Sequence, residues 1–307
     1  MNIGLANLID EGLLAHVEES RAFAAARQAA GGQHAPTNYD ELKAVRRSMP
    51  PDSAGVRTVE CVARSGQTKV PVRVTSPSTG GSRATYLDIH GGGFYLGSAI
   101  RSDARNARLA DRLGVTVVSV EYRLAPEHPW PAAPDDCETA ALWVIDEGPR
   151  RFGTNRMLIG GASAGATLAM TTLLRLRDQN RVHPVVGAML QFGGYDLSGQ
   201  SPGGRMYADE WFIQAYAGHV PDRTDPDVSP LFGDLRGLPS TLLLVGTLDP
   251  LLEDSLAMAA RLSAAGNDVD LRVFPESMHG FTSHATPMAA AALDGVETWL
   301  GGRLGDQ

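Results

Sequence analysis

The stretch Gly161-Ala162-Ser163-Ala164-Gly165 decides the fold of this chain, because it joins a strand pattern to a helix pattern through a very tight turn. A short apolar run precedes the stretch and a long helical pattern follows it. A serine among small residues at such a turn is typical of a nucleophile elbow, where the serine backbone is strained and larger neighbours would clash. The alternative interpretation is a glycine-rich turn that a serine merely caps.

Strand and helix patterns alternate on both sides of this turn, which indicates a mainly parallel sheet covered by helices on both faces. The sequence therefore predicts an α/β fold, with an early hairpin around Ser65-Gly66 that makes one edge of the sheet antiparallel. The expected strands are 56–63, 70–75, 84–89, 115–120, 157–160, 185–191, 241–245 and 269–274, and the expected helices are 101–113, 134–146, 167–177, 254–265 and 288–300.

Two segments lie outside this alternation. Residues 1–50 predict two N-terminal helices, an amphipathic one over 1–30 and a shorter one over 38–50 that ends at Pro50-Pro51. Residues 51–307 then form the α/β domain, with an insertion at about 195–235 that contains a short helix at 208–218 and lies above the sheet. Long irregular segments are uncommon unless they serve a site.

Composition limits the partners of this 307-residue chain. The hydrophobic content of 43% is typical of a globular protein, and no apolar run approaches the roughly 18 residues that a membrane span needs. The net charge of −8 and the lack of a basic stripe argue against nucleic acid as a partner.

The two cysteines, Cys61 and Cys137, provide neither a disulfide framework nor the spacing of metal ligands. The first 20 residues contain four acidic side chains and no early basic one, so they do not resemble a secretory signal. We therefore expect a cytoplasmic protein without a metal or an organic cofactor.

A serine nucleophile needs a neighbouring base, and His279 is the histidine that directly follows a predicted strand. Gly280 leaves room beside its ring, and its loop lies where the carboxyl ends of the strands meet. A histidine in an ordinary surface loop is the alternative interpretation.

The base in turn needs a carboxylate that orients it, and Asp249 follows the predicted strand 241–245. An aspartate in this place can instead be a helix cap. Asp254 fits the cap or the first turn of the next helix better, and Asp196, after an earlier strand, is a weaker alternative for the orienting role.

Acyl transfer also needs N–H groups that point at the developing oxyanion. The glycine run Gly91-Gly92-Gly93 follows the strand 84–89 and His90, and three glycines leave the backbone N–H groups accessible. The amide of Ala164, at the start of the elbow helix, is a third donor. A flexible turn is the alternative.

With these pieces placed, the chain resembles the hormone-sensitive-lipase family of α/β hydrolases, the bacterial family IV carboxylesterases. The resemblance rests on the order of serine, aspartate and histidine and on four further matches. These are His90-Gly91-Gly92-Gly93-Phe94, the block from Tyr122 to Ala133, Asp249-Pro250-Leu251 and His279-Gly280-Phe281.

The resemblance implies a Ser163–His279–Asp249 triad, an oxyanion hole from Gly91, Gly92 and Ala164, and a structural role for His90. It also implies two-step acyl transfer and often dimerisation, here through the strand 269–274 and the helix 288–300. Residues 51–307 would be the catalytic domain, and the helices of residues 1–50 and the insertion at about 195–235 would form a cap over its site. Two positions depart from the family pattern: Ala162 stands where an acidic residue is usual, and Ala166 where a third glycine is frequent.

The substrate is expected to be a small ester, because aromatic residues over a buried serine favour compact, moderately apolar ligands. The resemblance to the family implies substrates with short-to-medium acyl chains. The same site would also serve an amidase, a deacetylase or an acyltransferase, and a non-catalytic small-molecule receptor has the same fold. Candidate pocket residues are Phe94, Tyr95, Trp211, Phe212, Tyr216 and Phe281.

Overall fold

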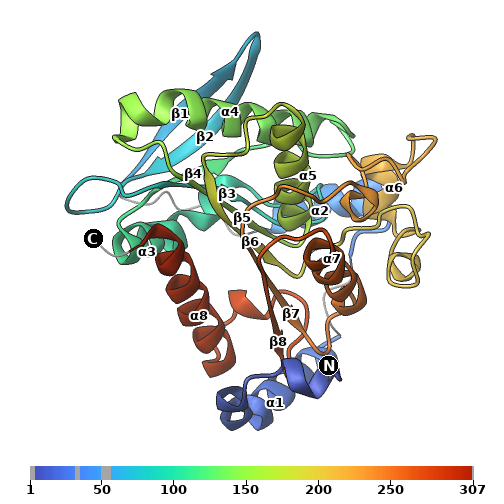
Figure 1. Ribbon diagram of the computed structural model, residues 1–307. Coiled ribbons are helices and arrows are strands. Elements are labelled where there is room, and N and C mark those ends of the chain that lie inside the picture. The colour runs from blue at the N-terminus through green and yellow to red at the C-terminus, as the bar shows by residue number, and fades with distance from the viewer. Residues whose placement is uncertain (1–3, 32–34, 50–56, 306–307) are drawn as a thin grey trace.

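The computed structural model describes residues 4–31, 35–49 and 57–305, which build an eight-stranded sheet with helices on both faces (Figure 1). The strands lie across the sheet in the order β1-β2-β4-β3-β5-β6-β7-β8. Their bounds are Thr58–Ser65 (β1), Thr68–Thr75 (β2), Thr85–Ile89 (β3), Thr116–Val120 (β4), Met157–Ala162 (β5), Val185–Gln191 (β6), Thr241–Gly246 (β7) and Val269–Phe274 (β8).

The sheet is parallel from β4 to β8 and antiparallel at the β1–β2 edge. This confirms the predicted α/β fold and the predicted hairpin. The hairpin projects beyond helix α4 (Ala132–Phe152), at the top of Figure 1. Lys69 lies in its second strand and is exposed.

The register of the central strands determines which loops meet. Ile89 at the end of β3 pairs with Gly161 of β5, and Gln191 at the end of β6 pairs with Ala162. The carboxyl ends of parallel strands meet at one edge of a sheet, where ligands of α/β proteins bind. The segments that follow β3, β5 and β6 therefore converge.

The strand side chains alternate between two cores, one on each face of the sheet. Leu87 and Ile159 belong to the core beneath α4, α5 and α7, whereas Tyr86 and Leu158 belong to the core beneath α3 and α8. The remaining bounds are Asp103–Leu113 (α3), Ala164–Asp178 (α5), Leu252–Ala264 (α7) and Pro287–Leu304 (α8).

All five predicted helices of the catalytic domain are present, with shifted ends. The greatest difference is α4, predicted over 134–146, which continues to Phe152 and stops at Gly153 with φ +75°. A glycine in this conformation is a common helix terminator, and Gly114 ends α3 in the same way. The expected helix 101–113 begins at Asp103, after a 3₁₀ turn over Ala99–Ser102.

The predicted single helix over 1–30 is wrong. Two 3₁₀ turns, Leu5–Leu8 (η1) and Glu11–His16 (η2), precede the helix α1, Val17–Ala29. Ile9 and Asp10 are extended, and the Asp10 carboxylate accepts a hydrogen bond from the Gly12 amide at 2.7 Å. Leu8, Ile9 and Leu13 pack on the core beneath α8 as separate contacts, so they need no common helical face.

The second N-terminal helix is confirmed as α2, Tyr39–Ser48, which Asn38 caps. Pro50 and Pro51, predicted to end it, lie outside the described residues. The predicted helix at 208–218 is also present, as α6, Trp211–Ala217, between two 3₁₀ turns over Gly204–Met206 and Pro230–Phe232.

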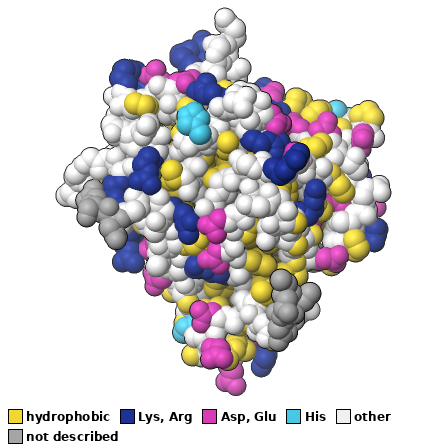
Figure 2. All heavy atoms as spheres, viewed as in Figure 1, with side chains coloured by type: hydrophobic (Ala, Val, Ile, Leu, Met, Phe, Trp, Pro, Cys, Tyr) yellow, Lys and Arg dark blue, Asp and Glu magenta, His cyan; other side chains and the backbone are white. Residues whose placement is uncertain are grey.

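The described surface carries charges of both signs. Lys and Arg side chains alternate with Asp and Glu side chains on the face that Figure 2 shows. None of the helices that the described residues form combines the length and the apolar character needed to cross a membrane.

Candidate active site

Ser163 stands between the last residue of β5 and the first residue of α5, in a backbone conformation with φ +55° and ψ −125°. Few residues other than glycine adopt a positive φ, and such strain persists only where the surroundings impose it. One such restraint is the hydrogen bond of 2.9 Å from the Ser163 amide to the Gln191 carbonyl oxygen. The turn therefore presents the serine hydroxyl above the carboxyl edge of the sheet.

Small residues are required around this turn because neighbouring backbone atoms lie very close to it. A Cβ atom on Gly161 would lie 2.3 Å from the Gly165 carbonyl oxygen. A Cβ atom on Gly165 would lie 2.1 Å from the carbonyl oxygen of Ile89, the last residue of β3. Both distances are shorter than van der Waals contact, so the strand, the turn and α5 can pack this closely only with glycine.

Three side chains that follow three different strands meet at the elbow. His279 Nε2 lies 3.0 Å from Ser163 Oγ, and His279 Nδ1 lies 2.9 Å from Asp249 Oδ2 and 3.0 Å from Oδ1. The Asp249 side chain is fully buried, whereas the His279 side chain is 35% exposed. These distances allow Nδ1–H to donate to the carboxylate while Nε2 accepts from the serine hydroxyl.

Asp249 is also fixed by its own loop, because its Oδ1 atom accepts a hydrogen bond of 2.8 Å from the Leu251 amide. This bond resembles the helix-cap alternative, although the residue at the cap position of α7 is Leu251. The carboxylate therefore has two partners, one from its own turn and the other from the imidazole.

Asp196 and Asp254, the two alternatives to Asp249, have hydrogen-bond partners outside the triad. Asp196 accepts hydrogen bonds from the Ser198 and Ser201 amides, at 2.9 and 2.6 Å, and so closes its own turn. Asp254 lies in the first turn of α7, as predicted, and accepts hydrogen bonds from the Tyr207 hydroxyl and the Tyr195 amide. Burial raises the pKa of the Asp254 carboxyl above its usual value.

The glycine loop after β3 lies against the elbow. A Cβ atom on Gly91 would lie 2.6 Å from the Ala162 carbonyl oxygen and 3.4 Å from Ser163 Cβ, and Gly92 has φ +121°. Among the described residues the amides of Gly91 and Gly92 donate to no protein group. The amide of Ala164, as the first of its helix, has no intrahelical acceptor. These three N–H groups are thus available to a ligand beside Ser163.

His90 holds this loop from beneath. Its Nδ1–H donates to the Gly91 carbonyl oxygen at 2.8 Å, and its ring stacks on Tyr122 with centroids 4.1 Å apart. The Tyr122 hydroxyl donates in turn to the His90 carbonyl oxygen at 2.9 Å. Burial lowers the pKa of His90 to about 4, which keeps the ring neutral near pH 7.

The block from Tyr122 to Ala133 supports the same loop through its backbone. The Ala125 amide donates to the Phe94 carbonyl oxygen at 3.0 Å. From α2, the Arg46 guanidinium donates to the Tyr95 and Ala125 carbonyl oxygens, at 2.8 and 2.9 Å, and pairs with Glu127 at 2.6 Å. An N-terminal helix is therefore joined directly to the glycine loop.

The predicted pocket aromatics fall into three groups. Phe94 and Tyr216 are a buried stacked pair with ring centroids 4.0 Å apart. Tyr95 lies with its ring against Trp211 and Phe212 of α6, at centroid distances of 5.9 and 6.0 Å, next to Gly93.

The third group is Phe281 alone, and here the structure favours a core position. Phe281 is 4% exposed and packs against Phe274 and Phe192 in the core beneath α8.

Gln191 and Phe192, which follow one another at the end of β6, were not predicted as site residues. The Gln191 carbonyl accepts from the Ser163 amide, and the Phe192 ring meets the His279 ring edge-on at 5.1 Å. The signal that could have found them is their place at a strand end next to the elbow strand. Arg46 was missed as well, and no local pattern distinguishes it from the neighbouring Arg47.

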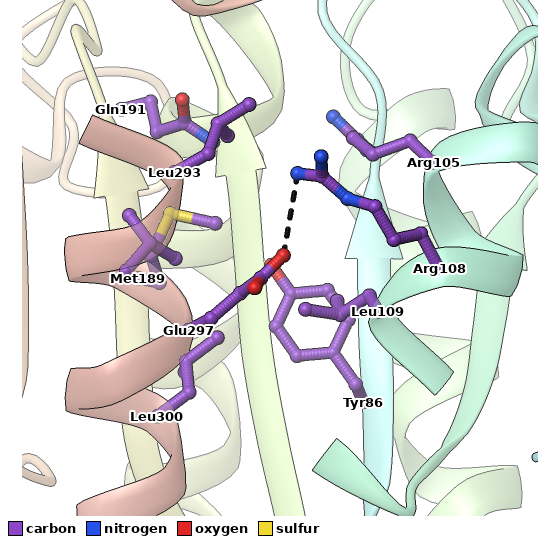
Figure 3. A pocket seen from close by; sticks show the side chains of 10 residues that line it. Tyr86, Arg105, Arg108, Leu109, Met189, Gln191, Leu293, Glu297 and Leu300 are labelled. Carbon is purple, nitrogen blue, oxygen red and sulfur yellow. Dashed lines mark ion pairs between the residues drawn. The ribbon is translucent and has the colours of Figure 1, made fainter. Parts of the chain in front are cut away.

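A separate pocket opens between α3 and α8, on the other face of the sheet from α5 (Figure 3). Arg108 and Glu297 form an ion pair of 3.2 Å across it. Its wall also includes Gln191, so this one residue borders both the elbow and the pocket. The other lining residues are Tyr86, Arg105, Leu109, Met189, Leu293, Val296 and Leu300.

The described part of the chain contains no cluster of three or more His, Cys, Asp or Glu side chains placed to hold a metal ion. Of the two thiols, Cys137 is buried and Cys61 is half-buried.

The chain is similar to known proteins over most of its length. A family model described as an alpha/beta hydrolase fold matches residues 86–283. Carboxylic ester hydrolase LipN of Mycobacterium tuberculosis is 31% identical over 256 residues, which cover 78% of this chain and 68% of that protein. Ethyl acetate hydrolase of Pseudomonas putida is 30% identical over 259 residues, with 79% and 80% covered.

Solved structures agree as well. An esterase of Pyrobaculum calidifontis superposes with a TM-score of 0.78 at 28% identity and covers 90% of this chain and 97% of its own. A hormone-sensitive lipase from a metagenome library gives a TM-score of 0.73 at 26% identity, with 95% and 98% covered. The chain belongs to the α/β-hydrolase-fold family. Within that fold its relatives are the esterases of the hormone-sensitive-lipase family, and it is a carboxylic ester hydrolase.

Proposed function

We propose that this chain hydrolyses short-to-medium-chain acyl esters through a Ser163–His279–Asp249 triad and an acyl-enzyme intermediate. The observation that carries the proposal is the continuous hydrogen-bonded path from Ser163 Oγ through the imidazole to the buried carboxylate, with each distance at 2.9–3.0 Å. Nucleophile, base and orienting group in such contact are the signature of an activated serine.

In the first step His279 Nε2 accepts the hydroxyl proton as Ser163 Oγ attacks the ester carbonyl carbon. The tetrahedral intermediate then breaks its bond to the alcohol oxygen, and the imidazolium gives that oxygen the proton. Asp249 remains ionised throughout and stabilises the imidazolium.

In the second step water attacks the acyl-enzyme, and His279 accepts its proton. Collapse of the second tetrahedral intermediate returns this proton to Ser163 Oγ and releases the carboxylic acid. The amides of Gly91, Gly92 and Ala164 would hold the oxyanion in both steps, because they have no protein acceptor among the described residues. One such donor typically stabilises the transition state by about 3 kcal/mol.

A small ester fits the aromatic residues around the glycine loop. The half-buried Phe212 lies with Tyr95 beside Gly93, and the half-buried Trp211 contacts the Tyr95 ring, so these three rings would limit the size of an acyl group. The names of several relatives agree, since they are an ethyl acetate hydrolase and acetyl esterases. We propose that residues 1–50 and the insertion at about 195–235 form a cap over this site.

The test is a profile of p-nitrophenyl esters of increasing acyl length, measured beside Ser163→Ala and His279→Ala. We expect acetate and butyrate to be hydrolysed, a long-chain emulsion not to be, and each variant to lose at least about 10³-fold in kcat. Full activity of Ser163→Ala would contradict the proposed site. Equal turnover of the long-chain emulsion would contradict the proposed substrate size.

An ester and its amide analogue, compared in the same assay, separate ester hydrolysis from amidase or deacetylase activity. Saturable binding without turnover of any ester would indicate a receptor. The cytoplasmic location and a homodimer through β8 and α8 stay predictions. In the single chain the 3₁₀ turn η1 contacts β8, which is one of the two elements of the predicted dimer interface.

A further inference from the structure

Gln191 connects two loops of the proposed triad, although its side chain forms its hydrogen bond to Thr282 and not to a triad residue. It is the last residue of β6, and its carbonyl oxygen accepts the hydrogen bond from the Ser163 amide at 2.9 Å. Its side-chain oxygen Oε1 accepts a second hydrogen bond, from the Thr282 hydroxyl, at 2.8 Å. One residue thus holds the serine turn with its backbone and the histidine loop with its side chain.

Thr282 is rigidly placed relative to His279. It lies three residues further on, in the 3₁₀ turn η6, Phe281–Ser283. Gly280 precedes that turn with φ +73°, and the Phe281 amide donates to the Met278 carbonyl oxygen at 3.2 Å. Because this turn is short and hydrogen-bonded, a displacement of Thr282 would move His279 with it.

The side chain of Gln191 has packing on only part of its surface. It is 3% exposed, yet it borders the pocket between α3 and α8, where Figure 3 shows it close to Leu293 and above Met189. A buried amide that borders an open space is not fixed by packing alone. The hydrogen bond to Thr282 therefore has a large part in fixing its orientation.

We propose that Gln191 is a positioning residue that sets the distance between Ser163 Oγ and His279 Nε2 through its bond to Thr282. This inference rests on the proposed triad. A displacement of about 1 Å between reacting groups can cost on the order of 10²-fold in rate. Loss of the hydrogen bond between Thr282 and Gln191 would therefore lower kcat. The substrate pocket on the α6 side would keep its affinity for the ester.

The variants Thr282→Val and Gln191→Met remove one partner each at nearly constant volume, and the double variant removes both. We expect each single variant to lower kcat about tenfold, with KM changed by less than twofold, and the double variant to lose no more than the worse single one. Thr282→Ser keeps the hydroxyl and should keep most of the activity.

Two further measurements distinguish positioning from general damage. The second-order rate of inactivation by diethyl p-nitrophenyl phosphate, which reacts with an activated serine, should fall in parallel with kcat. Thr298→Val is the matched control, because Thr298 is exposed on α8 and its hydroxyl bonds to the Asp294 carbonyl oxygen of the same helix. It should leave kcat, KM and the inactivation rate unchanged.

The inference is overturned if kcat of Thr282→Val stays within twofold of the original, if Thr282→Ser loses as much as Thr282→Val, or if the two single losses add in the double variant. Ser163→Ala is assayed beside them. If that variant stays active, the proposed function fails; if it is inactive while Thr282→Val is normal, only the tie through Gln191 fails.

Discussion

The glycines that flank Ser163 are required by close contact, because neither Gly161 nor Gly165 has a positive φ. Each lies where a Cβ atom would meet a backbone oxygen at 2.1–2.3 Å. These oxygens belong to the first turn of α5 and to the end of β3, and a backbone oxygen cannot move aside as a flexible side chain can. The elbow therefore depends on the missing side chains themselves.

Gly165→Ala should accordingly displace the start of α5 from β3, since the new Cβ atom would also lie 2.6 Å from the His90 carbonyl oxygen. We expect overpacking to cost about 1–3 kcal/mol in the free energy of unfolding and the oxyanion donors to move apart. Chemical denaturation and kcat/KM measure the two effects, and we expect kcat/KM to fall at least tenfold.

Gly302→Ala is the matched control for this change. Gly302 lies exposed in α8, and a Cβ atom added to it would meet no heavy atom within 4 Å. Alanine should stabilise the helix there by up to about 1 kcal/mol and leave kcat/KM unchanged. Equal stability of Gly165→Ala and the original protein would show that the elbow relaxes more easily than its distances indicate.

At the scale of elements, α2 is held to the glycine loop by one side chain. Arg46 donates to two backbone carbonyl oxygens and pairs with Glu127, while Leu42 of the same helix is fully buried. The N-terminal helix and the loop after β3 should therefore move as a unit.

Arg46→Met removes these polar contacts and keeps the apolar stem of the side chain. We expect a loss of about 1–3 kcal/mol in the free energy of unfolding, because the buried carbonyl oxygens lose their donors. We also expect a lower kcat, because Tyr95 lies only two residues after Gly93 of the glycine loop. The control is Arg47→Met, on the exposed side of α2. Equal stability and equal kcat of the two variants would show that the hydrogen bonds of Arg46 contribute to neither.

The sequence was sufficient to place the elements that surround the site, and the reason is local. Ser163, Asp249 and His279 each lie within five residues of the end of a strand, and parallel strands bring such residues to one edge. The hydrogen bonds between the loops were not predictable from the sequence. The bond from Thr282 to Gln191 spans 91 positions, and any of several polar residues could have made it. The N-terminal helix was mispredicted because apolar spacing alone does not reveal the extended residues Ile9 and Asp10.

At the scale of the whole molecule, the stability should depend on pH through the buried His90. Its folded pKa of about 4 lies below the ordinary histidine value, so the unfolded chain binds more protons between these two values. Stability therefore rises with pH across that window and is lost as the pH falls from about 6.5 to 4. The expected loss from this group is about 3 kcal/mol.

Urea unfolding at pH 7 and at pH 4.5 measures this dependence. His90→Gln should be less stable at pH 7 and should lose less stability on acidification than the original protein. His183→Gln, at an exposed position, controls for the loss of a histidine as such. If the free energy of unfolding of the original protein and of His90→Gln changed with pH in parallel, His90 would not be the source of the pH dependence.

The projecting β1–β2 hairpin has a practical consequence, because the whole sequence contains only two lysines, Lys43 and Lys69. Lys69 lies exposed on the hairpin, whereas Lys43 pairs with Asp40 at 2.7 Å on α2. Amine-reactive coupling of the side chains to a bead or a dye can therefore attach at two points only. Changing Lys43 to arginine would leave the hairpin as the single side-chain anchor, and an immobilised preparation would hold its molecules by the edge of the sheet opposite β8.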